Sequence, residues 1–155
     1  MSEQGSEARH VIRPYRPADE SAVVALWETC GLTRPWNDPR ADLSRAHERD
    51  PDLLLVAVSA HGGENGSKPG IVGTVMAGYD GHRAWIYYLA TAPTHRGRGI
   101  ARALIAEAER RLQRLGSPKV QLMVRAENTG VAGLYEKLGY VRSDVIVLQR
   151  VLPGA

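Results

Sequence analysis

Residues 95–105 have the sequence "HRGRGIARALI", in which two glycines and two arginines stand directly before an apolar helical pattern. Glycine reaches backbone dihedrals that other residues avoid, and the N-terminus of a helix carries partial positive charge. A glycine-rich turn that opens a helix therefore lets backbone N–H groups close on an anion. The stretch predicts a site for a ligand that carries phosphate.

Strand and helix patterns alternate on both sides of this turn. Their order is β-α-α-β-β-β-α-β-α-β, and three consecutive strands within it indicate a mixed sheet rather than a doubly wound parallel one. We therefore expect a single-domain α/β fold with a mixed central sheet flanked by about four helices. The patterns predict strands at 10–15, 52–60, 70–79, 84–91, 119–125 and 145–152, and helices at about 17–30, 39–48, 100–115 and 129–138.

Length and composition predict one domain. A chain of 155 residues with 43% hydrophobic content can bury one sizeable core, which we place at residues 10–152. The polar residues 1–9 are expected to form a disordered leader, and residues 61–70 a mobile hairpin loop. No apolar run reaches the roughly 20 residues that a membrane helix needs. Cys30 is the only cysteine and no signal-peptide pattern follows Met1, so we expect a cytoplasmic protein.

The charge pattern argues against a polyanionic partner. The formal net charge is +3, and the 20 basic residues are scattered among 17 acidic ones. Without a basic run or an aromatic-basic motif, we expect no binding of nucleic acid. The histidines His10, His47, His61 and His95 do not have the spacing of metal ligands, so we expect no metal.

The residues after the glycines narrow the kind of phosphate site. A P-loop needs Lys and then Ser or Thr after its last glycine, but Gly99 is followed by Ile100 and Ala101. A Rossmann fingerprint needs glycine or alanine five residues after Gly97, and that position is Arg102. The P-loop is excluded, and a dinucleotide-binding protein remains only as a weaker alternative.

The turn instead resembles the Arg/Gln-x-x-Gly-x-Gly/Ala signature of the GNAT N-acetyltransferases, which Arg96, Gly99 and Ala101 satisfy. The resemblance runs from about residue 10 to 150. The stretches that carry it are "VIRPYRPAD" at 11–19, similar to the family's opening strand and turn, "LATAPTHRGRGIARALI" at 89–105, similar to its fourth strand, loop and third helix, and "ENTGVAGLYEKLGY" at 127–140, similar to its fourth helix. "GLTRPWNDP" at 31–39 and "GYDGHR" at 78–83 further resemble a small bacterial YpeA-like subgroup.

The resemblance implies an enzyme that moves an acetyl group from acetyl-CoA, as co-substrate, directly to an amine of a small molecule or a protein. Backbone N–H groups of the turn can cradle the pyrophosphate of CoA, while the family places the pantetheine arm along the strand that ends at 89–91. An N–H near Leu89 is then implied to hold the thioester carbonyl and the oxyanion. The implied cofactor-binding residues are Leu89, Ala90, Thr91, Arg96, Gly97, Arg98, Gly99, Ile100, Ala101 and Asn128.

Tyr135 is the general acid that the resemblance implies for the departing thiolate. Its position, in line with Val131, Leu134 and Leu138 on one helical face, also suits a core tyrosine. The two interpretations are compatible, because a packed ring can still present its hydroxyl.

The general base and the acceptor site have several candidates in the sequence. Several GNAT branches carry a glutamate where this chain has Trp85. Asp80 and His82 are candidate bases or acceptor contacts, although an Asp-Gly pair is also a hairpin-turn signal, and water held by tyrosines 87 and 88 is a third option. Trp36 could line the acceptor pocket, and Asp38 could attract a cationic amine or simply cap a helix.

Two further expectations remain open. A noncatalytic acyl-CoA-binding regulator on the same fold is the alternative to an enzyme, because it would keep the glycine turn without a working acid or base. The second is the assembly: a homodimer is one option, and no sequence feature specifies the oligomeric state.

Overall fold

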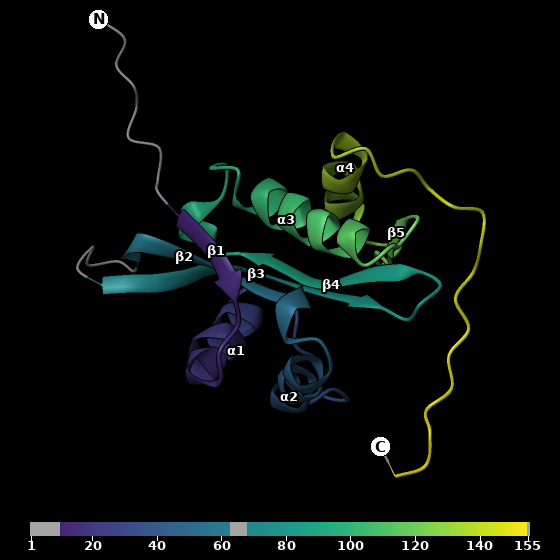
Figure 1. Ribbon diagram of the computed structural model, residues 1–155, viewed down its shortest axis with the longest axis horizontal. Coiled ribbons are helices and arrows are strands. Elements are labelled where there is room, and N and C mark those ends of the chain that lie inside the picture. The colour runs from purple at the N-terminus through teal and green to yellow at the C-terminus, as the bar shows by residue number, and fades with distance from the viewer. Residues whose placement is uncertain (1–9, 63–67, 155) are drawn as a thin grey trace, which may run out of the picture. The chain divides into compact units, whose positions relative to one another are not determined.

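The computed structural model describes residues 10–62 and 68–154 (Figure 1). The predicted leader at 1–9 and the centre of the predicted hairpin loop lie outside these ranges. The chain divides into two compact units, one up to Met123 and one from Val124 onward, and each is described by itself.

The first unit is built on a five-stranded sheet whose order, β1-β2-β3-β4-β5, follows the sequence. Neighbouring strands are antiparallel except for β4 and β5, which are parallel. The predicted mixed sheet is confirmed. The strands are β1 (His10–Pro14), β2 (Leu54–Gly62), β3 (Lys68–Tyr79), β4 (Ala84–Thr91) and β5 (Val120–Leu122).

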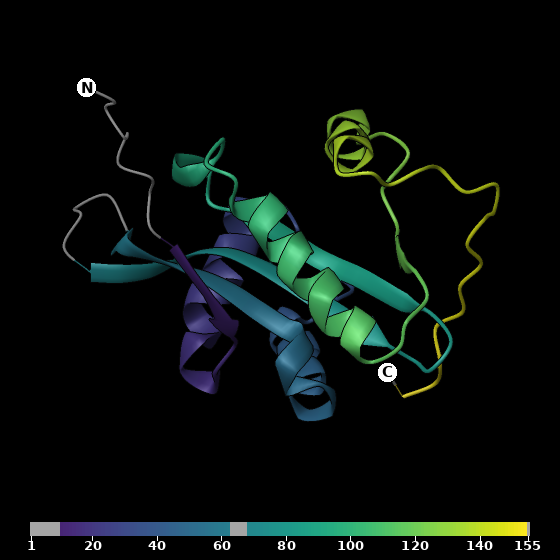
Figure 2. The same cartoon turned by 45° about the horizontal axis from the view of Figure 1, so that its top comes forward.

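Helices cover both faces of this sheet. Figures 1 and 2 show α1 (Glu20–Thr29) and α2 (Pro39–Arg49) on one face and α3 (Ile100–Arg114) on the other. The Asp38 side chain accepts a hydrogen bond of 2.9 Å from the Arg40 N–H, which confirms that it caps α2. Among the described residues, no helix combines the length and hydropathy needed to cross a bilayer.

A hydrophobic core lies between the sheet and each helical layer. On the α1 and α2 face, Trp27 and Leu43 are fully buried among apolar residues of β2 and β4. On the opposite face, α3 presents an apolar stripe at three- and four-residue spacings, as its sequence predicts. The buried members of this stripe are Ile100, Leu104, Ile105, Ala108 and Leu112.

The first turns of α3 sit unusually close to β3 at Gly73. A Cβ atom added there would lie 2.7 Å from the Ile100 Cγ2 atom and 2.9 Å from the Leu104 Cδ1 atom, inside van der Waals contact. Only glycine leaves room for this approach, so Gly73 sets the distance between the sheet and the helix that follows the glycine turn.

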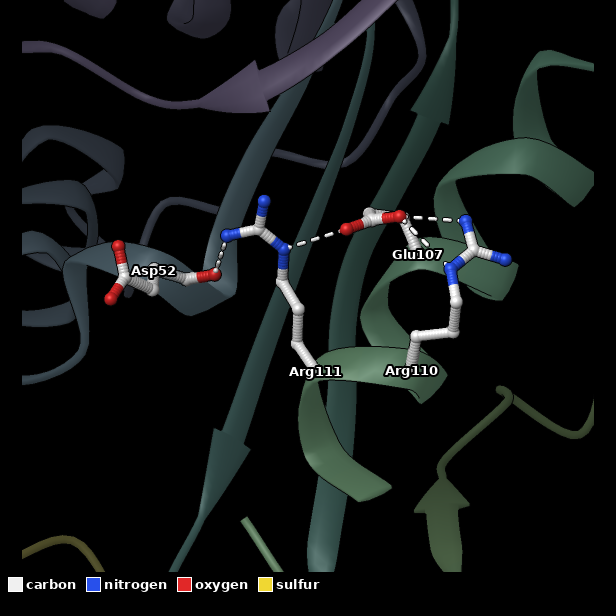
Figure 3. Close-up of polar contacts among 4 residues, drawn as sticks. All are labelled: Asp52, Glu107, Arg110 and Arg111. Atoms are coloured by element: carbon white, nitrogen blue, oxygen red, sulfur yellow. Dashed lines mark hydrogen bonds and ion pairs between the residues drawn. The ribbon is translucent and has the colours of Figure 1, made fainter. Parts of the chain in front are cut away.

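The far end of α3 is tied down by polar contacts, which Figure 3 shows. Arg111 donates from Nη1 to the carbonyl oxygen of Asp52, at 2.9 Å, and pairs through Nε with Glu107, also at 2.9 Å. Glu107 in turn accepts from Arg110 at 2.6 Å. Asp52 belongs to the short 3₁₀ helix η2 (Pro51–Leu53) that leads into β2, so these contacts join α3 to the start of that strand.

The second unit contains α4 (Thr129–Lys137), which begins directly after Asn128, as predicted. Gly139 follows the helix in the left-handed region, with φ of +95°. Inside this unit the rings of Tyr135 and Tyr140 pack edge to face, with centroids 5.7 Å apart.

The strand predicted at 145–152 is wrong, because the described residues after α4 form no strand. Val145, Ile146 and Leu148 are 70–86% exposed. β-Branched side chains favour a strand by packing on a pleated, half-buried surface, and they cannot form a strand without a neighbour to pair with. The strand predicted at 119–125 is shorter in the structure, where only the residues of β5, Val120–Leu122, pair with β4.

Candidate active site

The glycine turn has the backbone that the sequence predicts. Gly97 and Gly99 both lie in the left-handed region, with φ of +79°, and Gly99 is the N-cap of α3. A Cβ atom added at either glycine would meet no atom within 4 Å, so the space in front of the turn is open. The helical hydrogen bonds of α3 begin with the N–H of Ala103, which donates to the Gly99 carbonyl. The preceding N–H groups of the helix remain available to an anion.

Positive charge surrounds this turn. The side chains of Arg96 and Arg98 are exposed, and within the described ranges neither forms an ion pair. His95 is buried just before them, and its Nδ1 atom lies 2.8 Å from the Thr94 hydroxyl. Burial, followed by the nearby charge of Arg98, lowers the pKa of His95. The imidazole is therefore neutral at pH 7, while the two guanidinium groups face solvent.

A β-bulge interrupts β4 before it reaches the turn. One residue of β3, Val75, stands opposite two residues of β4, Tyr88 and Leu89. Tyr88 is the one non-glycine residue with positive φ, at +50°, in the part of the chain that the structure describes. Such a conformation costs about 1–3 kcal/mol and persists only where surrounding contacts hold it.

Three contacts hold Tyr88 in this conformation. Its ring stacks on the indole of Trp27, with centroids 3.7 Å apart and planes 7° from parallel. Its hydroxyl donates to the Asp42 carboxylate at 2.7 Å, and its carbonyl accepts from the Thr74 hydroxyl at 2.9 Å. Burial, together with the hydrogen bond to Asp42, raises the pKa of Tyr88, so this hydroxyl stays protonated and donates.

The bulge adjoins a part of β4 that lacks a partner on one side. Pairing with β5 covers only Ala84 to Ile86. Within the described residues, no strand pairs with the β5 side of Leu89, Ala90 or Thr91. An extended ligand can use such an edge as a strand would, and the same chain segment continues into the glycine turn through the 3₁₀ helix η3 (Pro93–His95).

The other predicted acceptor and base residues lie in a turn and in a connecting segment. The Asp80 carboxylate accepts backbone N–H bonds from His82 and Arg83, at 2.7 and 2.8 Å, in the turn between β3 and β4. These bonds lower the pKa of Asp80, which makes its carboxylate a weaker base. Trp36 is 70% exposed in the segment between α1 and α2. Of the residues described, no three His, Cys, Asp or Glu side chains gather as a metal site would need.

The second unit carries two predicted residues. Asn128 is the N-cap of α4, but its side chain makes no capping hydrogen bond. Tyr135 is 8% exposed, and burial raises its pKa to about 12. Its hydroxyl therefore retains its proton at neutral pH.

Sequence reasoning missed Thr74, Trp27, Asp42 and Gly73. Trp27 and Asp42 look like ordinary helix residues, and Thr74 like an ordinary strand residue, until long-range packing brings them to Tyr88. Gly73 offered the one usable signal, because a glycine within an apolar strand often marks a close approach of another backbone or helix.

Comparison with known proteins agrees with this geometry. Residues 21–140 match the acetyltransferase (GNAT) family. An acetyltransferase of Pectobacterium atrosepticum is 52% identical over 141 residues, which cover 91% of this chain and 94% of the relative. An acetyltransferase of Sodalis glossinidius is 50% identical over 137 residues, covering 88% of this chain and 91% of the relative.

Solved structures show the same fold. The crystal structure of Ard1 from Thermoplasma volcanium has a TM-score of 0.72 and 25% identity, covering 86% of this chain and 84% of the other. The NatC complex bound to Gag peptide and CoA has a TM-score of 0.71 and 25% identity, covering 87% and 86%. The chain therefore belongs to the GNAT acetyltransferase family.

Proposed function

We propose that this chain transfers an acetyl group from acetyl-CoA directly to the nitrogen of an amine. The observation that carries the proposal is the continuity of two features along one segment. The bulge at Tyr88 and Leu89 lies beside an unpaired strand edge, and the glycine turn at 96–101 follows a few residues later. A thioester, an extended arm and a pyrophosphate can meet these features in the order in which CoA carries them.

The cofactor-binding residues are proposed in three groups. The open N-terminus of α3 and the turn before it hold the pyrophosphate through backbone N–H groups of Arg96 to Ala101. Arg96 and Arg98 supply positive charge, consistent with their exposure. The edge at Leu89 to Thr91 pairs with the pantetheine arm. Asn128, at the start of α4, is a further proposed contact that rests on the family resemblance.

The chemistry requires a neutral amine, a polarised carbonyl and a proton for the leaving group. The amine lone pair attacks the thioester carbon and forms the C–N bond, and the Leu89 N–H stabilises the oxyanion. The C–S bond then breaks, the thiolate takes a proton from the Tyr135 hydroxyl, and the nitrogen loses its extra proton to a base or to water. Burial raises the pKa of Tyr135 to about 12, so the hydroxyl carries a proton at neutral pH but is a weaker acid than an exposed phenol.

The acceptor is proposed to enter on the α1 and α2 face, in keeping with the position of the Asp42–Tyr88 pair there. Trp36 is exposed and stands six residues before Asp42 in the sequence, and it remains a proposed acceptor contact. Asp80, His82 and water held by tyrosines 87 and 88 remain the candidates for the base. The experiment must distinguish an amine of a small molecule from an amine of a protein. We also propose that the chain acts in the cytoplasm, and as a homodimer.

The experiment is a thiol-release assay with acetyl-CoA against peptides, polyamines and amino-sugar antibiotics. Thiol release that depends on one amine class, with the acetylated product seen by mass spectrometry, supports the proposal. CoA binding without turnover on any amine would favour an acyl-CoA-binding regulator. A rise in Tm with NAD but not with CoA would favour a dinucleotide-binding protein.

A further inference from the structure

We propose that Thr74 is a positioning residue for acetyl transfer, because its hydroxyl fixes the peptide between Tyr88 and Leu89 and so aims the Leu89 N–H. The inference rests on the proposed function and deepens it. It assigns a task to a buried polar side chain on β3.

The geometry of one peptide group carries the inference. The Thr74 side chain is fully buried, and its Oγ1 atom lies 2.9 Å from the Tyr88 carbonyl oxygen. All described peptide bonds are trans, and in a trans peptide the C=O and the following N–H point in opposite directions. Because the Tyr88 carbonyl points to the Thr74 hydroxyl, the Leu89 N–H of the same peptide points away from Thr74, and we infer that it faces the edge that β5 leaves unpaired.

Trp27 determines the direction of this hydrogen bond. Its Nε1–H donates to the Thr74 hydroxyl at 2.9 Å. An indole nitrogen can only donate, and a hydroxyl has one proton. Thr74 must therefore accept from Trp27 and give its own proton to the Tyr88 carbonyl. The chain of two bonds is also expected to strengthen each member, because bonds in series polarise one another.

The side chain of Tyr88 secures the other end of the arrangement. Stacking on Trp27 and the hydrogen bond to Asp42 hold a residue whose φ of +50° is unfavourable for tyrosine. Trp27 thus contacts both Thr74 and the Tyr88 ring. If the Thr74 hydroxyl is lost, the peptide keeps its side-chain tether and loses the contact that sets its rotation.

A change in the direction of the Leu89 N–H should lower kcat by a predictable amount. Hydrogen bonds weaken steeply when the donor angle departs from linearity, and removal of a whole oxyanion donor lowers kcat by about 10²–10³-fold. A rotated but present donor should cost less. We expect Thr74→Val to lower kcat about tenfold, with the Kd for CoA changed less than about twofold.

The test observes the thioester carbonyl directly and needs no acceptor. [1-¹³C]Acetyl-CoA is bound to the wild-type protein and to Thr74→Val, Thr74→Ser and Ser59→Ala, and the carbonyl ¹³C shift is recorded. Thr74→Ser keeps the hydroxyl. Ser59→Ala removes another buried hydroxyl of the same sheet, on β2, and serves as the matched control. The kcat of each variant is then measured with the amine that gives the highest turnover.

The expected result is a downfield shift on binding to wild type that shrinks toward the free value in Thr74→Val, returns in Thr74→Ser and is unaffected in Ser59→Ala. An unchanged shift and kcat in Thr74→Val, or a Thr74→Ser variant as impaired as Thr74→Val, overturns the positioning role alone. Failure of the wild type to bind acetyl-CoA overturns the proposed function, and the inference with it.

A second variant keeps the inference testable if Thr74→Val does not fold. Tyr88→Phe removes the tether to Asp42 and leaves the Thr74 contact in place. We expect Tyr88→Phe to reduce the ¹³C shift of the bound carbonyl less than a rotation of the peptide between Tyr88 and Leu89 would. A complete loss in Tyr88→Phe would mean that the phenol, rather than Thr74, sets the peptide, and would overturn the assignment.

Discussion

The dihedrals of Gly99 decide whether the turn can hold an anion. Valine at φ of +79° is strained wherever it occurs, and its side chain would fill the open space in front of the turn. We expect Gly99→Val to abolish measurable CoA binding by calorimetry while the protein remains folded. Gly116→Val is the matched control, because Gly116 has φ of +94° and equally free surroundings at the other end of α3. It should show a similar loss of stability with normal CoA affinity, and equal affinities in both variants would contradict the cradle.

Removing the hydroxyl oxygen of Tyr135 distinguishes a catalytic role of the hydroxyl from the packing role of the ring. Tyr135→Phe keeps the ring that packs on Tyr140, so the fold should survive. If the hydroxyl protonates the thiolate, kcat should fall about 10²-fold with little change in CoA affinity. Tyr140→Phe is the control, since it removes the hydroxyl of the neighbouring ring. Lower stability with normal turnover in Tyr135→Phe would instead leave the residue a core tyrosine.

The close packing of α3 on β3 depends on Gly73, which has a hydrogen atom where other residues have a side chain. Gly73→Ala places a methyl group against Ile100 and Leu104, so the helix must move or the side chains must shift. We expect a loss of about 1–3 kcal/mol in the free energy of unfolding, measured by urea denaturation, and weaker CoA binding because the glycine turn moves with α3. Gly78→Ala lies on the same strand, where an added Cβ meets nothing within 4 Å. Equal effects of the two substitutions would rule out the steric argument.

Elements with local signals could be predicted from the sequence, and those that depend on distant partners could not. The Asp38 cap, the apolar stripe of α3 and the glycine turn are each specified within a few residues. The bulge needs β3 as a partner. Tyr88 is held by Asp42, which lies 46 positions earlier in the sequence, and by Trp27, which stacks on its ring. Thr74 donates to its carbonyl from β3. The strand predicted at 145–152 failed for the same reason, because its composition says nothing about whether an edge is present to pair with.

The stability of the whole molecule should decline in acid partly through Asp19. Its carboxylate forms two hydrogen bonds with Arg13, at 2.7 and 2.9 Å, and accepts the Arg16 N–H. The Arg13 contact lowers the pKa of Asp19 in the folded state. Its stabilisation is therefore complete above the unfolded pKa of about 3.9 and is lost as the pH falls through the lower folded value.

Asp19→Asn tests this linkage. At pH 7 it should cost about 1–2 kcal/mol in the free energy of unfolding, and the difference from wild type should shrink between pH 4 and pH 2. The control is Asp144→Asn, at an exposed carboxylate. A difference in Tm that stays constant across this range would show that the Asp19 charge is not what stabilises the fold.

The length of β4 decides what can serve as the base. Arg83 and Leu89 are six residues apart, which at about 3.3 Å per residue separates the turn from the bulge by about 20 Å. A base must come within hydrogen-bond reach of the attacking amine, directly or through one water. We therefore expect amines to reach the thioester already neutral, so that the lower limb of the pH–rate profile follows the pKa of each acceptor. His82→Ala and Asp80→Asn should leave that limb in place. A limb that stays near 6.5 for every amine, the ordinary histidine value, and disappears in His82→Ala would instead make His82 the base and require the turn to fold over the bulge during turnover.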